Sequence, residues 1–287
     1  MEQVLKNKSI YITCCDYAIS GKQYDLLYNE EHDMLITHPQ LSAQDIEHYY
    51  AQDEYDSYIT GYKSLFQWVY YHARKLSIKL KINLVSKFVP EEGLVLDIGS
   101  GSGDFPLAAR RRGWSAKGVD SIKKARSVAN KSVPDLVMPP SYLATLGVQT
   151  FDVITLWHVL EHLPELDSQI RNLKRLIKAE GRIVLACPNF RSYDAKFFCK
   201  FWAAYDVPRH LWHFSRKSIS SLFQKHGMVV ESIHPMWLDS FYISLLSTRN
   251  KYGRYKILQA FLVGLISNIR AIFSGQFSSL IFVIRTK

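Results

Sequence analysis

The sequence predicts an α/β fold built as a doubly wound sheet, with a small extension at its N-terminus. An apolar run at 95–98 leads directly through a glycine-rich turn into a helix-forming segment, Phe105 to Arg112. Further strand-like runs follow at 114–120 and 151–157, and a helical pattern lies between them. Strands that alternate with helices in this way are typical of a parallel sheet with helices on both faces.

The glycine-rich turn carries the pattern Asp-x-Gly-x-Gly-x-Gly, from Asp97 to Gly103. Glycine has no Cβ, so a ligand can approach the main chain, and the amides at the start of the following helix face the same cleft. A dinucleotide site has the spacing G-x-G-x-x-G, which differs from the spacing here. The carboxylate of Asp97 attracts a cationic ligand and repels a pyrophosphate.

This pattern resembles the first motif of the class I S-adenosylmethionine-dependent methyltransferases. The resemblance implies that Gly99, Ser100, Gly101 and Gly103 hold the methionine part of S-adenosylmethionine, and that Asp97 holds its amino group. S-adenosylmethionine carries an ammonium and a sulfonium where a dinucleotide carries two phosphates, so an acidic residue fits it. A dehydrogenase that binds a dinucleotide is the alternative interpretation of the same strand, turn and helix.

Two later strand ends fit the same resemblance, because ligands in such folds bind at the carboxyl ends of the strands. The run 114–120 ends in Asp120. The resemblance assigns this carboxylate to the ribose hydroxyls and makes Ser121 its neighbour. The run 151–157 ends in Trp157 and is followed by His158. In the family, the residues at this strand end face the sulfonium and the adenine.

The remaining strands complete the predicted sheet. The segment 173–190 has the pattern of an amphipathic helix, a turn at Glu180–Gly181 and a fifth strand that ends at Pro188. Strand-like runs follow at 228–236 and 278–286. In the superfamily that the chain resembles, the last of seven strands is antiparallel and lies between the fifth and the sixth. The resemblance therefore implies a Rossmann-like sheet of seven strands with an antiparallel last strand.

A competing motif overlaps the end of the 151–157 strand. His158, Glu161 and His162 form H-x-x-E-H, which also matches a zinc-protease signature with two histidines on one helix. That signature needs a long helix, whereas His158 follows a β-branched run directly and Pro164 lies close behind. We therefore expect no metal here.

Residues 1–75 form the predicted N-terminal extension, and residues 76–287 form the predicted methyltransferase domain. Strand-like runs at 9–13 and 24–28 indicate a small hairpin, with a third piece at 34–37. A helix capped by Ser42 follows in the sequence pattern. We expect the extension to cover the cofactor and to shape the substrate pocket.

An aromatic segment at 191–215 follows the fifth strand and would lie over the carboxyl ends of the strands. It resembles the substrate loop of the quinone-biosynthesis O-methyltransferases, the group with a type 23 methyltransferase domain. The resemblance implies methyl transfer to a small aromatic or amphiphilic acceptor. Histidine titrates near neutral pH, so His158, His162, His210 and His213 are candidate bases for a hydroxyl acceptor, and we favour His210 and His213 because they lie in the aromatic segment. The residues leave open whether the acceptor atom is oxygen, nitrogen, sulfur or carbon.

The charge of the chain is polarised from end to end. The formal net charge is +10, yet residues 23–62 contain nine acidic residues and no lysine or arginine. After Asp239 there are seven basic residues and no acidic one. No RNA-binding module accompanies the positive charge, so we expect a small-molecule substrate rather than a nucleic acid. An RNA or protein methyltransferase and a non-catalytic S-adenosylmethionine-binding protein are the alternatives.

Cysteine usage and hydropathy predict a cytoplasmic protein. The four cysteines include no C-x-x-C pair, and the N-terminus lacks the apolar core of a signal peptide. The longest apolar stretch, 257–269, is too short to span a bilayer. The basic, apolar C-terminal part would allow at most a peripheral contact with an anionic membrane.

Overall fold

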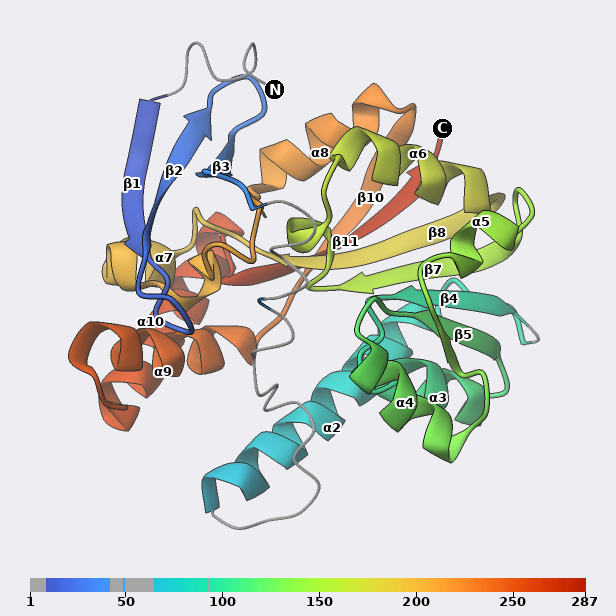
Figure 1. Ribbon diagram of the computed structural model, residues 1–287, viewed down its shortest axis with the longest axis horizontal. Helices are drawn as coiled ribbons and strands as arrows, with labels where there is room; N and C mark the ends of the chain where they lie inside the picture. The colour runs from blue at the N-terminus through green and yellow to red at the C-terminus, as the bar shows by residue number, and fades with distance from the viewer. Residues whose placement is uncertain (1–8, 42–48, 50–64, 92) are drawn as a thin grey trace.

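A seven-stranded sheet forms the centre of the molecule in a computed structural model, which describes residues 9–41, 49, 65–91 and 93–287 (Figure 1). The strand order is β10-β11-β8-β7-β4-β5-β6, and β11 runs antiparallel to both of its neighbours. The predicted doubly wound sheet with an antiparallel last strand is therefore confirmed. Its strands are β4 (Leu94–Ile98), β5 (Ser115–Val119), β6 (Val137–Met138), β7 (Phe151–Trp157), β8 (Ile177–Pro188), β10 (Met228–Pro235) and β11 (Ser279–Thr286).

Helices cover both faces of this sheet (Figure 1). On one face, α6 and α8 bury Ile170 and Phe223 in the same apolar cluster as Leu96 and Ile154. On the other face, α2 and α3 pack against the sheet through residues such as Val85 and Phe105. The helices are α2 (Leu65–Val85), α3 (Asp104–Arg111), α4 (Lys123–Ser132), α5 (Tyr142–Thr145), α6 (Leu166–Leu176), α7 (Tyr193–Phe198), α8 (Arg216–Lys225), α9 (Asp239–Tyr252) and α10 (Ile257–Ser274).

The predicted turn at Glu180–Gly181 is wrong. The helix ends at Leu176, and residues from Ile177 onward already belong to β8. The pairing of β8 with β7 is irregular at its start, where the register shifts between Phe151 and Val153. A Cβ at Gly181 would lie only 2.8 Å from the side chain of Ile177. This glycine therefore permits a distortion of the strand where the sequence pattern indicated a turn.

A second sheet of four strands lies beside the first, in the order β1-β2-β3-β9. The first three strands are β1 (Ser9–Cys15), β2 (Gln23–Asn29) and β3 (Met34–His38), which confirms the predicted hairpin and its third piece. The fourth strand, β9 (Trp212–His213), comes from the aromatic segment. The predicted helix from Ser42 lies outside the described residues. The division at residue 75 stays a prediction, and α2 runs across it.

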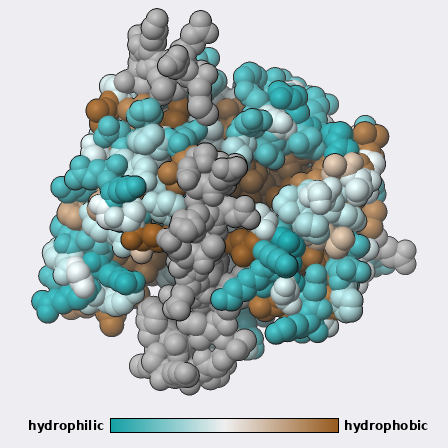
Figure 2. Space-filling model, viewed as in Figure 1, coloured by the Kyte–Doolittle hydropathy of each residue, from teal (hydrophilic) through white to brown (hydrophobic). Residues whose placement is uncertain are grey.

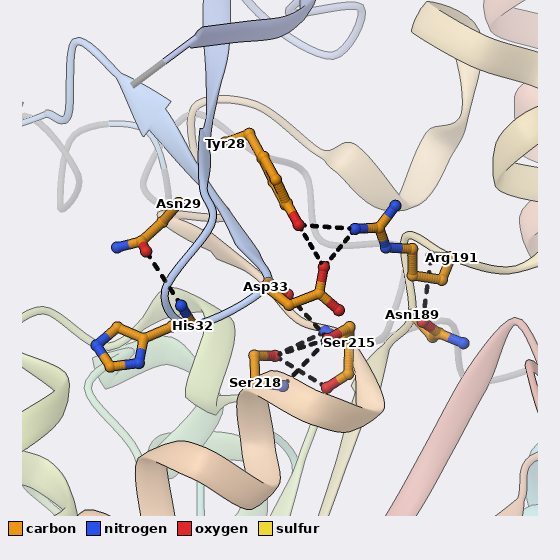
Figure 3. A network of polar contacts seen from close by, with 8 residues as sticks. All are labelled: Tyr28, Asn29, His32, Asp33, Asn189, Arg191, Ser215 and Ser218. Atoms are coloured by element: carbon orange, nitrogen blue, oxygen red, sulfur yellow. Dashed lines mark hydrogen bonds and ion pairs between the residues drawn. The ribbon is translucent and has the colours of Figure 1, made fainter. Parts of the chain in front are cut away.

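Polar contacts fix the small sheet to the start of α8 (Figure 3). Asp33, in the turn between β2 and β3, accepts hydrogen bonds from Tyr28 (2.9 Å) and from Arg191. Ser215 donates to the backbone oxygen of Asp33 (2.8 Å) and forms a capping box with Ser218. Burial alone would raise the pKa of Asp33, but the hydrogen bonds from Arg191, Ser215 and Tyr28 lower it. The N-terminal extension is thus attached to the aromatic segment.

The surface seen in Figure 2 is mostly hydrophilic, and hydrophobic residues show between the hydrophilic areas and near the grey segment. All four cysteines are free.

One helix, α10, is long and apolar enough to cross a membrane by length and composition, with a third of it (33%) buried. This helix continues to Ser274, past the end of the predicted apolar stretch at residue 269, and includes Arg270.

Candidate functional site: the glycine-rich loop and its cavity

The glycine-rich loop connects β4 to α3 with backbone conformations that favour glycine. Gly99 has φ 71°, and a Cβ there would lie 2.2 Å from the side chain of Val159. Gly101 has φ 53°, and the space beside it is open. The loop therefore packs closely on one side and leaves room for a ligand on the other.

Asp97 lies at the end of β4 beneath this loop and is 2% exposed. Its carboxylate accepts a hydrogen bond from Thr155 (2.6 Å). Burial raises the pKa of Asp97 to about 7, although the hydrogen bonds from Thr155 and Ser100 and the nearby Lys81 cation oppose this. A carboxyl group in this state gains from a cationic partner, which is what the amino group of an amino-acid ligand supplies.

Asp120 closes the other side of the loop. Its carboxylate accepts hydrogen bonds from the backbone amides of Gly101 (2.7 Å) and Ile122 (2.8 Å). The Ser100 side chain packs against Gly118. A Cβ at Gly118 would lie 2.2 Å from the hydroxyl oxygen of Ser100, so only glycine leaves room for it. Ser121 is exposed, next to Asp120. Asp97, the glycines and Asp120 thus form one edge at the carboxyl ends of β4 and β5.

Trp157 and His158 stand at the end of β7. The Trp157 ring contacts Phe105, and the ammonium of Lys81 lies 4.5 Å from its centroid. His158 forms ion pairs with Asp239 (3.0 Å) and Glu161 (3.4 Å). Burial alone would lower the pKa of His158, but these two carboxylates raise it to about 9. His158 is therefore a cation at neutral pH.

A cavity of about 710 Å³ extends from this edge toward the small sheet. Trp157, His158 and Gly99 lie at one end, and the aromatic segment supplies residues such as Tyr205 and His210 at the other. The walls also include residues of β1, α2 and α9, among them Cys14, Lys81, Tyr242, Ile243 and Leu246. The N-terminal extension therefore contributes β1 to the cavity wall. That it shapes a substrate pocket stays a prediction.

One carboxylate and two imidazoles lie together at the cavity: His162 and His210 line it, and the buried Glu161 lies beside them. Glu161 is 1% exposed, and its carboxylate is ion-paired with His158 (3.4 Å), although neither oxygen meets hydrogen-bond geometry within the described residues. The side chains of Glu161, His162 and His210 each offer a ligand atom, and these atoms lie within 4.8 Å of one another. This group could hold a metal ion. It differs from the zinc signature weighed above, because His158 is ion-paired and 160–162 is a single 3-10 turn.

Backbone carbonyls set the orientation of both imidazoles. Nδ1 of His162 donates to the oxygen of Arg209 (3.1 Å), and Nδ1 of His210 donates to the oxygen of Ala204 (2.9 Å). In each neutral ring, Nε2 is then the acceptor nitrogen. Burial and the neighbouring His210 lower the pKa of His162 to about 4. His162 is therefore neutral at physiological pH.

His213, the other predicted base, is 4% exposed and is not among the residues that line the cavity. Its Nε2 lies 3.0 Å from the hydroxyl of Thr37, and its ring packs against Tyr205. Burial and His210 hold its pKa well below the usual value. His213 thus links the aromatic segment to β3, and its catalytic role stays a prediction.

The sequence reasoning missed Lys81, Thr155 and Asp239. Lys81 lies on α2, and burial lowers its pKa although Asp239 and Asp97 oppose this. Lys81 lies within α2, and Asp239 is the first residue of α9. Charged residues at such positions are usually exposed, so the local sequence does not indicate that these two line a cavity. Thr155, a polar residue inside an otherwise apolar strand, was the one signal available in the sequence.

Comparison with known proteins identifies the family. The family described as "Methyltransferase domain" matches residues 70–233, which is more than half of the chain. The chain belongs to this methyltransferase family. The resemblance predicted from the sequence is therefore confirmed, and S-adenosylmethionine is the cofactor.

Curated relatives of this methyltransferase are named ubiquinone biosynthesis O-methyltransferases. The relative from Nitrosomonas europaea is 29% identical over 119 residues, which cover 38% of this chain and 51% of the relative. The relative from Pseudomonas paraeruginosa is 31% identical over 134 residues, which cover 44% and 57%. The chain thus spans about half the length of the curated relatives it matches.

Solved structures share the fold of this methyltransferase. A chain in the complex of the Haloferax volcanii Trm112 methyltransferase activator with a methyltransferase has a TM-score of 0.53 at 15% identity, covering 75% of this chain and 89% of that one. A sarcosine dimethylglycine methyltransferase from Galdieria sulphuraria has a TM-score of 0.50 at 14% identity, covering 73% and 84%. These likenesses concern the fold alone.

Proposed function

We propose that the protein transfers a methyl group from S-adenosylmethionine to a hydroxyl of a small aromatic or amphiphilic molecule. The observation that carries this proposal is the cavity that joins the end of β7 to His162 and His210, beside the buried Glu161. The names of the curated relatives, O-methyltransferases of ubiquinone biosynthesis, support an oxygen acceptor.

The proposed cofactor contacts follow the edge of the sheet. Asp97 would hold the amino group of S-adenosylmethionine, and the loop with Gly99, Gly101 and Gly103 would hold its methionine part. Asp120, with Ser121 beside it, would accept the ribose hydroxyls. Trp157 and His158 would then face the sulfonium and the adenine, so that the methyl group points into the cavity.

Methyl transfer is an in-line displacement, in which the acceptor oxygen bonds to the methyl carbon as the bond from carbon to sulfur breaks. The protein therefore has to align the acceptor and exclude water. The aromatic and aliphatic walls of the cavity, including Trp202, Tyr205 and Ile243, suit this task. Nε2 of His210 would take the proton of the acceptor hydroxyl, since Nδ1 already donates to Ala204.

The same three side chains also suit a divalent cation, because a buried carboxylate and two oriented imidazoles are typical ligands, and a bound cation would share Glu161 with His158. Such a cation would lower the pKa of an acceptor hydroxyl bound to it. A chelator separates the two versions of the mechanism: turnover that survives exhaustive chelation assigns the proton to His210 alone.

The test is incubation with methyl-labelled S-adenosylmethionine and fractionated metabolite extract, followed by identification of the labelled product. A labelled small molecule with a methoxy group supports the proposal. Label in RNA or protein favours the alternative methyltransferase classes. S-adenosylmethionine binding in calorimetry without label in any fraction favours a non-catalytic binding protein.

A further inference from the structure

The C-terminal helix α10 carries its large apolar side chains on the outside. In a helix that only completes a soluble core, large apolar residues face inward. The buried positions of α10 are instead small or polar: Ala260, Val263, Gly264, Ser267, Asn268 and Ala271. We call the opposite side the α10 outer face; its apolar residues are between 38% and 87% exposed and are Ile257, Leu258, Phe261, Leu262, Leu265, Ile266, Ile269, Ile272 and Phe273.

The orientation of α10 is fixed by specific contacts on its inner side. Ser267 donates a hydrogen bond to the buried carboxylate of Asp194 (2.7 Å), and Asn268 donates to the backbone oxygen of Trp237 (2.9 Å). A Cβ at Gly264 would lie 2.8 Å from the ring of Phe241, so α9 approaches α10 closely. Rotation of α10 to bury its outer face would break these contacts.

The charged residues of α10, and those of α9 and the α9–α10 turn after Asp239, are all positive. The chain has no acidic residue after Asp239. Lys251 and Arg254 are exposed in and beside the turn between α9 and α10, and Arg270 is exposed on α10 itself. Tyr252 and Tyr255 are exposed at the same turn. Apolar residues flanked by cations and tyrosines match the boundary between the headgroups and acyl chains of an anionic bilayer.

We propose that the α10 outer face docks on the surface of an anionic lipid membrane, with the helix lying in the plane of the interface. A second copy of this chain would bring the same positive charge against the surface, whereas anionic headgroups complement it. A transmembrane orientation would require α10 to leave Asp194 and Trp237, to which its inner side is bonded.

The docking surface is next to the cavity. The helix α9 packs against α10 and also supplies Tyr242, Ile243 and Leu246 to the cavity wall. A membrane under α10 therefore brings amphiphilic molecules close to the site. This last link rests on the proposed function, whereas the membrane contact itself does not.

The test is sedimentation with vesicles of phosphatidylcholine alone and of phosphatidylcholine mixed with phosphatidylglycerol. We expect the wild-type protein to bind the anionic vesicles at least about tenfold more tightly than the neutral ones, with binding weakened by salt. The double variant Leu258→Ser/Phe273→Ser removes two side chains that are 73% and 87% exposed, and should weaken binding at least about tenfold. Lys251→Glu/Arg254→Glu should weaken it by a similar factor at low salt.

The matched control is Val148→Ser, which removes an apolar side chain that is 69% exposed and lies outside α9 and α10. This variant should bind vesicles as the wild type does. Circular dichroism and S-adenosylmethionine binding, measured for every variant, separate loss of docking from loss of folding.

Three results would overturn the proposal. The first is equal sedimentation with and without anionic vesicles. The second is a dimer that Leu258→Ser/Phe273→Ser converts to a monomer while vesicle binding is absent, which assigns the surface to a second copy. The third is resistance to extraction by alkaline carbonate, which assigns α10 to a membrane span. The vesicle assay needs no acceptor, so its failure leaves the proposed methyl transfer intact.

Discussion

Asp97 is deeply buried and accepts a hydrogen bond from Thr155, and burial raises its pKa, so its ionisation responds to a ligand's charge. We expect Asp97→Asn to weaken S-adenosylmethionine binding by about 10- to 150-fold, because a hydrogen bond to a charged group contributes about 1.5–3 kcal/mol. Isothermal titration calorimetry measures this. Asp135→Asn, at an exposed acid away from the loop, is the control and should bind normally.

The same residue predicts how S-adenosylmethionine affinity depends on pH. The pKa of Asp97 is about 7 in the free protein, so below that pH the carboxyl group has to release a proton before it can hold an ammonium. Affinity should rise by about tenfold per pH unit up to pH 6 and level off above pH 7. Calorimetry in buffers of different ionisation enthalpy also reports the released proton. A flat profile in the wild type would contradict the assignment of Asp97.

The folded-state pKa of Asp97 also affects stability, with a definite sign. It is raised above the ordinary value of 3.8, so its contribution to stability is present below pH 3.8 and is lost as the pH rises through 7. The ligand's ammonium reverses this loss when it binds.

His210 and His213 form a matched pair for testing the proposed base. His210→Ala should lower turnover by about 10²- to 10⁴-fold, the usual contribution of a general base, while S-adenosylmethionine affinity stays unchanged. His213→Ala should act mainly through the contact with Thr37 and reduce stability. Single-turnover rates and calorimetry on the true acceptor distinguish the two. Equal rates for His210→Ala and the wild type would show that His210 is structural.

At the scale of elements, one buried carboxylate joins three parts of the chain. Asp194 on α7 is fully buried and accepts hydrogen bonds from Trp202 (2.7 Å), Ser267 (2.7 Å) and Ser278 (2.6 Å). Asp194→Ala leaves three donors without a partner and should destabilise the protein by about 3–5 kcal/mol. Ser267→Ala removes one donor and should cost about 1 kcal/mol. Urea unfolding measures the free energy of unfolding of both variants. Equal decreases would show that Asp194 does not stabilise more than its contact with Ser267.

Local patterns predicted the elements that depend on neighbouring residues. The loop from Asp97 to Gly103 is such a case, because a strand, a turn and a helix follow one another directly within 94–111. The capping box at Ser215 is another. The distortion at Ile177 and Gly181 was missed, since it depends on how β8 pairs with β7.

Long-range contacts explain what the sequence did not reveal about the site. His158 and Asp239 are 81 residues apart, and Thr37 and His210 are 173 apart. No pattern of hydropathy or spacing encodes such pairs. In the sequence, Glu161 and His162 were visible only as part of a zinc motif with His158. His210 is distant in the sequence and joins the group only through the fold.

At the scale of the whole molecule, cofactor binding should raise thermal stability by mass action. At a concentration of about 100 times its dissociation constant, S-adenosylmethionine should stabilise the folded state by about 2.7 kcal/mol. For a chain of this size this corresponds to a rise of about 4–5 °C in the melting temperature. Differential scanning fluorimetry tests this. Protection by NAD instead of S-adenosylmethionine would favour a dehydrogenase.

The two-residue strand β9 pairs with β3, although most of the chain lies between them. During synthesis the chain emerges from its N-terminus, so the glycine-rich loop and Asp120 are complete long before β9 appears. The wall formed by α9 comes later still. The residues of the glycine-rich edge are therefore synthesised well before those that line the far end of the cavity. A chaperone or an early ligand that meets the growing chain would encounter the two ends of the cavity at different times.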